Sequence, residues 1–288
     1  MDELVARLRS AGCVFAEDEA RILTEAADGD AARLEELVTA RVGGLPLEHL
    51  VGWAELDGRR WLVAPGVFVP RQRSELLVRE AAERAAAGAV GATGALAETT
   101  TAGPVLLVDL CCGCGALGGA VAARLLAAGH DVEIHAADVD PVAVACAHDN
   151  LKALSDDDVP PGAGRLTAHT YTGDLADPLP AEVWGRVDVL VANAPYVPTE
   201  AIGMMPPEAR EHEPHAALDG GDDGLVILRR VISLAPTLLR PGGHLLVETG
   251  ETQVSAAVEH MTAAGLTPTV LTDDDLGATA LAATRPTT

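Results

Sequence analysis

From residue 105 onward, short apolar runs rich in Val and Leu alternate with longer stretches of helical periodicity. Repeated strand–helix units of this kind predict an α/β fold with a mostly parallel, doubly wound sheet. The predicted strands are 105–109, 133–137, 166–171, 187–192, 244–248, 268–272 and 278–284. The predicted helices of the same region are 116–128, 141–154, 225–239 and 254–264.

The run 187–192 is short and rich in Val, which favours an interior strand of a parallel sheet. It is followed directly by the tetrapeptide Asn193-Ala194-Pro195-Tyr196. This tetrapeptide is therefore predicted to lie at the carboxyl end of a central strand, which is where open α/β sheets place their ligands.

The part of the chain before this region carries different patterns. Apolar residues at helical spacing predict a small helical domain, and two apolar runs around Asp57-Gly58 predict a β-hairpin. The predicted division is a helical domain at 1–52, a hairpin linker at 53–73 and the α/β domain at 74–288.

Two further local features belong to the start of the α/β domain. A helix is predicted to begin near Ser74, with this serine as its N-cap. The stretch 88–104 is mostly Gly, Ala and Thr with little periodicity, so it is predicted to be a flexible surface insertion.

The charge of the chain limits its partners. The formal net charge is −23, whereas duplex binding needs clustered Lys and Arg that displace counterions. A general nucleic-acid-binding surface is therefore disfavoured. The simplest interpretation of the acidic excess is that it keeps an Ala-rich protein in solution.

The cysteines and the apolar stretches bear on the compartment. Five cysteines without disulfide-like spacing indicate a reducing environment, and the acidic N-terminus lacks the order of a signal peptide. The stretch 103–129 is long enough to cross a bilayer, but Asp109, Arg124 and a dense glycine cluster favour a turn within a sheet. We therefore predict a cytoplasmic protein without a membrane span.

The first strand is joined to its helix by a turn rich in glycine and cysteine, 109–116. Glycines such as Gly113 and Gly115 let a ligand approach the backbone closely. A nucleotide phosphate would use the bare helix N-terminus, whereas a ligand with an amino acid end would use the same amides and the Asp109 carboxylate. The alternative is a tight turn that only packs.

Two acids follow the next two strands. Asp138 comes about 20 residues after the glycines, the spacing of an acid that accepts both hydroxyls of a ribose; Asp140 is the alternative, although it resembles a helix start. Asp174, followed by Leu175, is placed to accept a hydrogen bond from an adenine amino group, or it is a common turn residue. Together with the turn, these acids describe a pocket for an adenosine without a 5′-phosphate.

The tetrapeptide suggests the reaction. The side-chain oxygen of Asn193 and the carbonyl of Ala194 are placed to accept both hydrogens of one planar NH2 group. Holding such a poor nucleophile beside an electrophile aligns its lone pair and stabilises the developing positive charge. Tyr196 would wall this pocket by stacking on a flat amide or base. The alternative for Asn-x-Pro is a simple turn.

Taken together, the turn, the two acids and the tetrapeptide resemble the S-adenosylmethionine-dependent class I methyltransferases that modify planar nitrogens. Further segments resemble one branch, the HemK/PrmC-type protein-glutamine N5-methyltransferases, which act on the Gly-Gly-Gln loop of peptide chain release factors. These segments are 44–52, 68–75, 213–221 and 241–253. The resemblance runs in order from about residue 40 to 255, and it implies a Rossmann-like class I methyltransferase fold.

The resemblance also implies roles for individual residues and for the N-terminal helices, which would help to hold a protein substrate. Catalysis would use Asn193, Ala194, Pro195 and Tyr196. The cofactor S-adenosylmethionine would be bound by Asp109, Cys111, Gly113, Gly115, Asp138, Asp174, Leu175 and Asn193. The substrate would be bound by Asn193, Tyr196, Arg71 and Glu213.

Two positions depart from the family's pattern, which has proline where this chain has Ala194 and glycine where it has Cys111. A paralogue acting on another glutamine-containing protein fits the sequence as well as a release factor enzyme does. The alternatives are a methyltransferase acting on an exocyclic amine of a nucleic-acid base, and a non-catalytic interaction protein with the same fold.

The remaining polar clusters are interpreted more simply. Cys111, Cys112 and Cys114 are spaced too tightly for the usual paired zinc motif, and no metal site is predicted. Arg71 and Arg73 would dock an acidic substrate or pair with the chain's own carboxylates, and the second interpretation is favoured.

Overall fold

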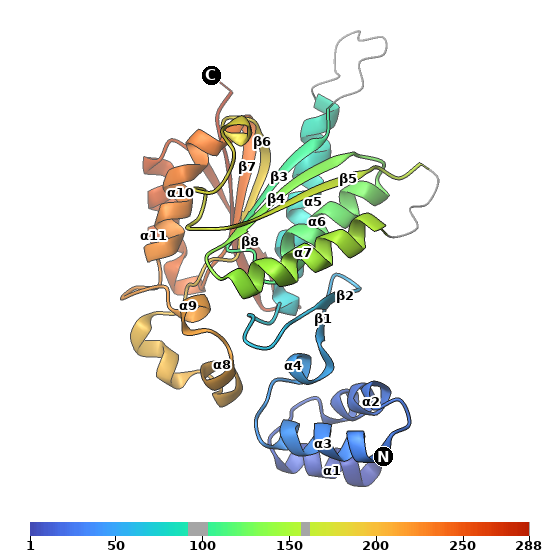
Figure 1. Ribbon diagram of the computed structural model, residues 1–288. Coiled ribbons are helices and arrows are strands. Elements are labelled where there is room, and N and C mark those ends of the chain that lie inside the picture. The colour runs from blue at the N-terminus through green and yellow to red at the C-terminus, as the bar shows by residue number, and fades with distance from the viewer. Residues whose placement is uncertain (92–102, 157–161, 288) are drawn as a thin grey trace.

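The computed structural model describes residues 1–91, 103–156 and 162–287. Within these ranges the main sheet has the strand order β5-β4-β3-β6-β7-β9-β8 (Figure 1). Its strands are β3 (Val105–Leu110), β4 (Val132–Asp138), β5 (Leu166–Thr172), β6 (Val187–Ala192), β7 (Leu239–Glu248), β8 (Thr267–Asp273) and β9 (Ala278–Thr284). The pairs from β5 to β7 are parallel, and β9 is antiparallel to both β7 and β8. The predicted α/β fold with a mostly parallel sheet is confirmed.

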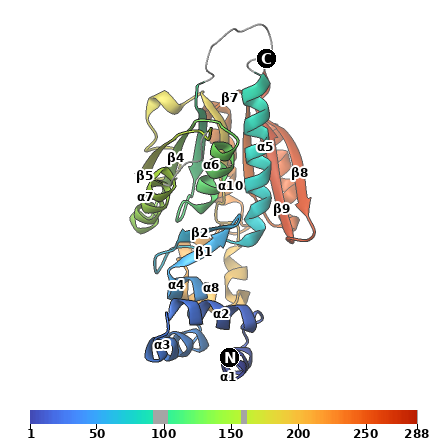
Figure 2. The same cartoon turned by 90° about the vertical axis from the view of Figure 1, so that its right-hand side faces the viewer.

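Helices cover both faces of this sheet, as Figures 1 and 2 show. One face carries α5 (Glu75–Gly91), α6 (Ala116–Ala127) and α7 (Pro141–Asp156), and the other carries α10 (Val226–Leu238) and α11 (Val254–Ala263). The central strand β3 is buried at every position, because a strand covered on both faces must be apolar along its length. Two separate hydrophobic clusters fill the two interfaces.

The N-terminal helices pack around a small hydrophobic cluster of their own. They are α1 (Asp2–Ser10), α2 (Ala16–Ala26), α3 (Ala31–Val42) and α4 (Leu47–Val51). The predicted hairpin follows as β1 (Trp53–Leu56) and β2 (Arg59–Leu62), joined at Asp57-Gly58. The hairpin is anchored by Trp61, which is buried in the cluster beneath α5, α6 and α7. The division into domains at residues 52 and 73 stays a prediction.

The chain after β6 forms irregular structure that lies between the sheet and the N-terminal helices. It contains the 3₁₀ segment η3 (Thr199–Met204) and the short helices α8 (Pro207–His212) and α9 (His215–Leu218). Figure 2 shows α8 next to the N-terminal helices. An ion pair fixes this contact, because Nη1 of Arg41 in α3 lies 2.6 Å from Oε2 of Glu208 in α8.

Three local predictions need correction. Ser74 ends the 3₁₀ segment η1 (Gln72–Ser74) and does not cap α5; its hydroxyl instead donates to Glu248. α5 continues to Gly91, so residues 88–91 of the predicted insertion are helical, and 92–102 lie outside the described residues. The segment 240–243, predicted to end a helix, belongs to β7.

No helix in the described ranges has both the length and the apolar character needed to cross a bilayer.

Candidate active site

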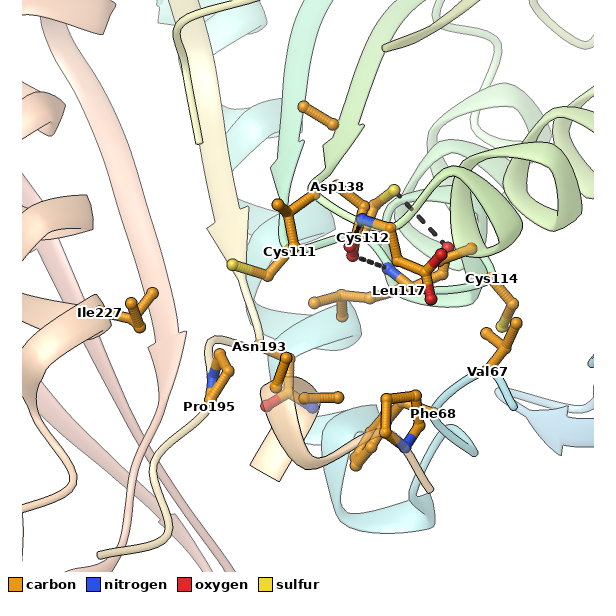
Figure 3. Close-up of a pocket in the computed structure, with 18 of the residues that line it drawn as sticks. Val67, Phe68, Cys111, Cys112, Cys114, Leu117, Asp138, Asn193, Pro195 and Ile227 are labelled. Carbon is orange, nitrogen blue, oxygen red and sulfur yellow. Dashed lines mark hydrogen bonds between the residues drawn. The ribbon is translucent and has the colours of Figure 1, made fainter. Parts of the chain in front are cut away.

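The carboxyl ends of β3, β4 and β6 meet at a cavity of about 720 Å³, called here the larger cavity. Parallel strands bring their carboxyl ends to one edge of the sheet, and this is where α/β folds place ligands. Cys111, Asp138 and Asn193 follow or end these three strands, and all three line the cavity (Figure 3). Phe68, from the segment after the hairpin, lines it on the side opposite Asp138.

The turn after β3 is built from left-handed backbone. Cys111, Gly113 and Gly115 have φ of +57°, +54° and +76°, a conformation that costs a residue with a Cβ about 1–2 kcal/mol. This cost explains why two of the three positions are glycine, and it means that the backbone at Cys111 is strained. The amide of Gly113 donates to Oδ2 of Asp138 at 2.9 Å, so the turn is tied to the end of β4.

The strain at Cys111 leads to a stability prediction. Cys111→Val is expected to lower the melting temperature by several degrees relative to Cys111→Ala, because a β-branched side chain tolerates positive φ poorly. The difference corresponds to about 1–2 kcal/mol, and each kcal/mol moves the melting temperature of a chain this size by roughly 2–4 °C. Thermal unfolding of the two variants, monitored by circular dichroism, measures it. Equal melting temperatures would mean that the turn relaxes.

Asp109 does not line the larger cavity, contrary to the direct ligand contact that the sequence suggested. Its side chain is fully buried, and Oδ2 accepts a hydrogen bond from the Gly118 amide at 2.9 Å, which fixes the first turn of α6. In the described part of the chain its Oδ1 has no hydrogen-bond partner. Burial raises the pKa of Asp109 from 3.8 to about 7.

Asp138 lies in the lining of the larger cavity, as the sequence predicted. Its Oδ1 accepts from the Asp140 amide at 3.0 Å, and burial raises the pKa of its carboxyl group. Asp140 also lines the cavity, but its carboxylate accepts from the Val142 amide at 2.8 Å in the first turn of α7. The interpretation of Asp140 as a helix start is thus confirmed.

Asp174 and Leu175 also line the larger cavity. The Asp174 carboxylate is not free, however, because its Oδ2 lies 2.7 Å from Nη2 of Arg230, and both side chains are about half exposed. No local sequence signal points to this pair, since Arg230 lies on α10, 56 residues away. One oxygen, Oδ1, remains as an acceptor toward a ligand.

A smaller cavity of about 270 Å³ adjoins the larger one. The residues that line both cavities are Phe68, Asn193, Pro195 and Ala217. Ala194 and Tyr196 line the smaller cavity. The tetrapeptide therefore stands at the junction between two compartments, and the side chain of Asn193 reaches both.

The amide of Asn193 is oriented by two residues that the sequence analysis did not assign to the site. Its Nδ2 makes a long hydrogen bond of 3.5 Å to the Ser74 hydroxyl, which itself donates to Oε2 of Glu248 at 2.7 Å. With Nδ2 directed to Ser74, the Oδ1 of Asn193 is left as an acceptor for a ligand. The sequence placed Glu248 at the end of a predicted strand and within the resembling segment 241–253, but it gave this residue no role in the site.

Tyr196 is held by the same carboxylate. Its hydroxyl donates to Oε1 of Glu248 at 2.8 Å and accepts from Arg73, whose Nε lies 2.7 Å from the same oxygen. Burial raises the pKa of Tyr196, so the phenol stays neutral at ordinary pH. Tyr196 lines the smaller cavity, where the sequence analysis expected it to form a wall. The hydrogen bonds of its hydroxyl group fix the orientation of the side chain.

Arg71 and Glu213 lie together in the lining of the smaller cavity. Nη2 of Arg71 donates to Oε1 of Glu213, so Arg71 pairs with one of the chain's own carboxylates, as the sequence analysis favoured. Oε2 of Glu213 is buried and has no hydrogen-bond partner among the described residues. Burial also raises the pKa of Glu213. Glu213 therefore keeps one unpaired carboxylate oxygen buried in the wall of the smaller cavity.

The backbone after the tetrapeptide is fixed by distant segments. The Val197 amide donates to the Leu218 carbonyl at 3.1 Å, and the Gly220 amide donates to the Val197 carbonyl at 2.9 Å. Nε2 of Gln253 donates to the Tyr196 carbonyl at 2.8 Å. The sequence segments 213–221 and 241–253 thus hold the tetrapeptide in place.

Comparison with known proteins finds several relatives that share one name. The chain is 34% identical over 214 residues to the release factor glutamine methyltransferase of Geobacter sulfurreducens, which covers 74% of this chain and 64% of that protein. It is 33% identical over 251 residues to the enzyme of the same name from Moorella thermoacetica, covering 85% and 76%. The chain thus spans slightly less than two thirds of the Geobacter protein. No protein-family model matches it.

Two other similarities are informative. The 4-amino-L-phenylalanine/4-methylamino-L-phenylalanine methyltransferase of Streptomyces pristinaespiralis is 34% identical over 224 residues, which are 78% of this chain and 68% of that protein. Among solved structures, the N-terminal domain of human METTL16 in complex with SAH matches with a TM-score of 0.50 at 14% identity, covering 88% of this chain and 84% of that one. The second match shows the fold alone.

Proposed function

The chain belongs to the release factor glutamine methyltransferase family of S-adenosylmethionine-dependent class I methyltransferases, and we propose that it methylates the side-chain amide nitrogen of a glutamine in a protein. The observation that carries this proposal is the position of Asn193 at the junction of two adjoining cavities. In a transferase the group donor and the group acceptor must meet at one point, and the junction of the two cavities is such a point.

The larger cavity fits the cofactor. Its volume of about 720 Å³ lies within the usual range for small-molecule sites, and its lining combines the left-handed turn, Asp138 and Asp174. We propose that Asp138 accepts the ribose hydroxyls, that the turn amides lie along the amino acid end and that Asp174 faces the adenine. When bound, S-adenosylmethionine supplies an electrophilic methyl group. Asp109 would act through the turn that it supports.

The smaller cavity would receive the glutamine side chain. Oδ1 of Asn193 and the Ala194 carbonyl would accept the two amide hydrogens, which turns the nitrogen lone pair toward the larger cavity. Held in this way, the amide nitrogen would face the electrophilic methyl group and would take it as the carbon–sulfur bond breaks, and the methylated amide would then release its proton to water. No general base is required.

The alanine at position 194 is compatible with this role. A proline there would restrict φ of the backbone, and Ala194 lacks that restraint. The neighbouring backbone is instead fixed by the hydrogen bonds of Val197 and Gln253. The Ala194 residue is itself only 2% exposed. We therefore propose that its carbonyl is held in place by packing.

The acceptor protein is proposed to be a peptide chain release factor, with its Gly-Gly-Gln loop entering the smaller cavity, or another glutamine-containing protein. Such a reaction would take place in the cytoplasm, where translation ends. The N-terminal helices and α8 flank the smaller cavity through residues such as Pro46, Glu48 and Glu208. These segments would contact the body of the acceptor protein.

A second candidate is an aromatic amine of a small amino acid, which the Streptomyces pristinaespiralis relative favours. The smaller cavity is compact, and the carboxylate of Glu213 in its wall would attract an ammonium group. A nucleic-acid base is less favoured, because the net charge of −23 opposes binding to phosphates.

The test is methyl transfer from labelled S-adenosylmethionine to purified release factors, with free 4-amino-L-phenylalanine as the competing acceptor. Label on the glutamine of the Gly-Gly-Gln loop supports the proposal. Label on the small amine alone supports the second candidate. If cofactor binds and neither acceptor is labelled, the release factor assignment fails and the proteins of a lysate become the next acceptors to test.

Glu213→Gln is expected to raise the KM for release factor about tenfold, while the dissociation constant of the cofactor stays within twofold. The variant loses a charge-assisted hydrogen bond to the acceptor, worth roughly 1.5 kcal/mol, but still accepts a hydrogen bond from Arg71. Steady-state kinetics and calorimetry measure the two constants. The matched control is Glu211→Gln, which lies exposed on α8, the short helix that ends directly before Glu213. An unchanged KM would remove Glu213 from the acceptor site.

A further inference from the structure

A cluster of metal-ligating side chains lies on β4 and β5, away from both cavities. The parallel register places His135 directly opposite His169. Glu133 lies two residues before His135 and therefore shares its face of the sheet. The ligand atoms of the three side chains all lie within 4.8 Å of one another. Among the described residues, this is the one cluster of three such side chains that comes together in this way.

We propose that Glu133, His135 and His169 bind a divalent transition metal ion of the zinc class. Two imidazole nitrogens and one carboxylate oxygen form a donor set suited to Zn²⁺, Co²⁺ or Ni²⁺. Water would complete a tetrahedral site. Ligand atoms around a zinc ion at about 2.0–2.1 Å are roughly 3.3 Å apart, so the side chains must close by about 1–1.5 Å. The ring of His169 is stacked on that of His135, with centroids 4.8 Å apart. Because His169 is exposed, its ring can turn out of this stack and direct a nitrogen to the ion.

The central ligand is already oriented for this role. Nε2 of His135 lies 3.0 Å from Oε1 of Glu133, and its Nδ1 lies 2.9 Å from the Tyr171 hydroxyl. Nε2 thus points to the other ligands, while Nδ1 is held by a neighbour. Histidines that bind metal commonly use their second nitrogen in such a hydrogen bond, which fixes the ring and its tautomer.

The proton balance of binding is simple. His135 is only 3% exposed, and burial lowers its pKa, so the ring is neutral. Without metal, the Nε2 proton is donated to Glu133 and Nδ1 accepts from Tyr171. With metal, Nε2 becomes the ligand, the ring is protonated on Nδ1, and the Tyr171 hydroxyl turns to accept that hydrogen. His135 therefore loses no net proton.

The position of the cluster allows an ion to enter from solvent. β5 is an edge strand of the sheet (Figure 1), and Glu133 and His169 are partly or fully exposed. A bound ion would link β5 to β4 through side chains, in addition to the backbone ladder. Because it binds the folded state alone, it would raise the free energy of unfolding with the logarithm of its free concentration once that concentration exceeds Kd.

Binding of Co²⁺ to the metal-free full-length protein tests the site. We expect one equivalent to bind, with a visible spectrum of nitrogen and oxygen ligands and without the thiolate charge-transfer band that the five cysteines would give. At a hundredfold excess over Kd, Zn²⁺ is expected to raise the melting temperature by about 5–10 °C.

Variants locate the ligands. His169→Gln and Glu133→Gln are each expected to weaken Co²⁺ binding at least tenfold, whereas His148→Gln, at an exposed histidine on α7, is expected to leave it unchanged. The proposal is overturned by a thiolate band, by absence of binding at millimolar Co²⁺, or by equal affinity in the His169→Gln variant. Methyl transfer plays no part in these measurements, so they stand apart from the proposed function.

Discussion

Replacement of Asn193 by alanine is expected to abolish methyl transfer while the dissociation constant of S-adenosylmethionine stays within a few-fold of the wild-type value. The Asn193 oxygen is the side-chain acceptor at the junction of the two cavities. Its loss leaves the acceptor nitrogen unaligned and its developing positive charge unstabilised. The loss of one preorganised polar partner in other enzymes costs about 10²–10³ in rate, and loss of alignment adds to that.

Three measurements on the same preparation make this result interpretable. Labelled methyl transfer gives the rate, isothermal titration gives the cofactor affinity, and thermal unfolding reports the fold. Ser74→Ala is the companion variant, because it removes the partner of Asn193 Nδ2 and the hydroxyl that donates to Glu248 but keeps Asn193 itself, and it should lower the rate less. Loss of cofactor binding in the Asn193 variant would show that the residue supports the fold of the site, and near wild-type transfer would place the acceptor elsewhere.

Replacement of Asp138 by alanine is expected to weaken binding of S-adenosylmethionine about 100-fold or more. Hydrogen bonds to a charged group contribute about 1.5–3 kcal/mol each, and the proposed contact to the ribose uses two. The same carboxylate accepts the amides of Gly113 and Asp140. The alanine variant therefore also loosens the turn that lines the larger cavity.

Asp138→Asn separates the two contributions. An asparagine has the same shape but lacks the charge, and its NH2 group would replace the acceptor of one of the two backbone amides. We therefore expect cofactor binding to weaken at least tenfold and the melting temperature to fall by a few degrees, less than in the alanine variant. Isothermal titration of both variants measures this. If the asparagine variant binds as tightly as the wild type and the alanine variant melts early, Asp138 supports the turn and does not contact the ligand.

Much of the fold could be predicted from local sequence. Short β-branched runs identified the strands, and the run 187–192 matches β6 at both ends. The Asp57-Gly58 pair identified the hairpin, since few residues other than glycine favour its left-handed backbone. The position of the tetrapeptide followed from the strand before it, and the placement of Asp138 followed from its distance after the glycines. These signals act over a few residues.

The contacts that orient the site could not be predicted in this way. Ser74 resembled a helix cap, but its hydroxyl binds Glu248, 174 residues later in the chain. Arg230 engages Asp174 from another helix. Asp109 resembled a ligand residue, yet it is fully buried beneath α6. In each case the hydrogen-bond partner depends on which helices and strand termini the fold brings next to each other.

The sequence by itself therefore determined the fold class, the strand that ends directly before Asn193 and most of the residues that line the larger cavity at that edge. The tertiary structure decided how those residues are oriented, and it brought Glu133, His135 and His169 together through the register of two parallel strands. The physical reason is that periodicity and turn chemistry are local properties of a chain. Hydrogen-bond partners across a sheet depend on strand order and register, which the packing of the whole core sets.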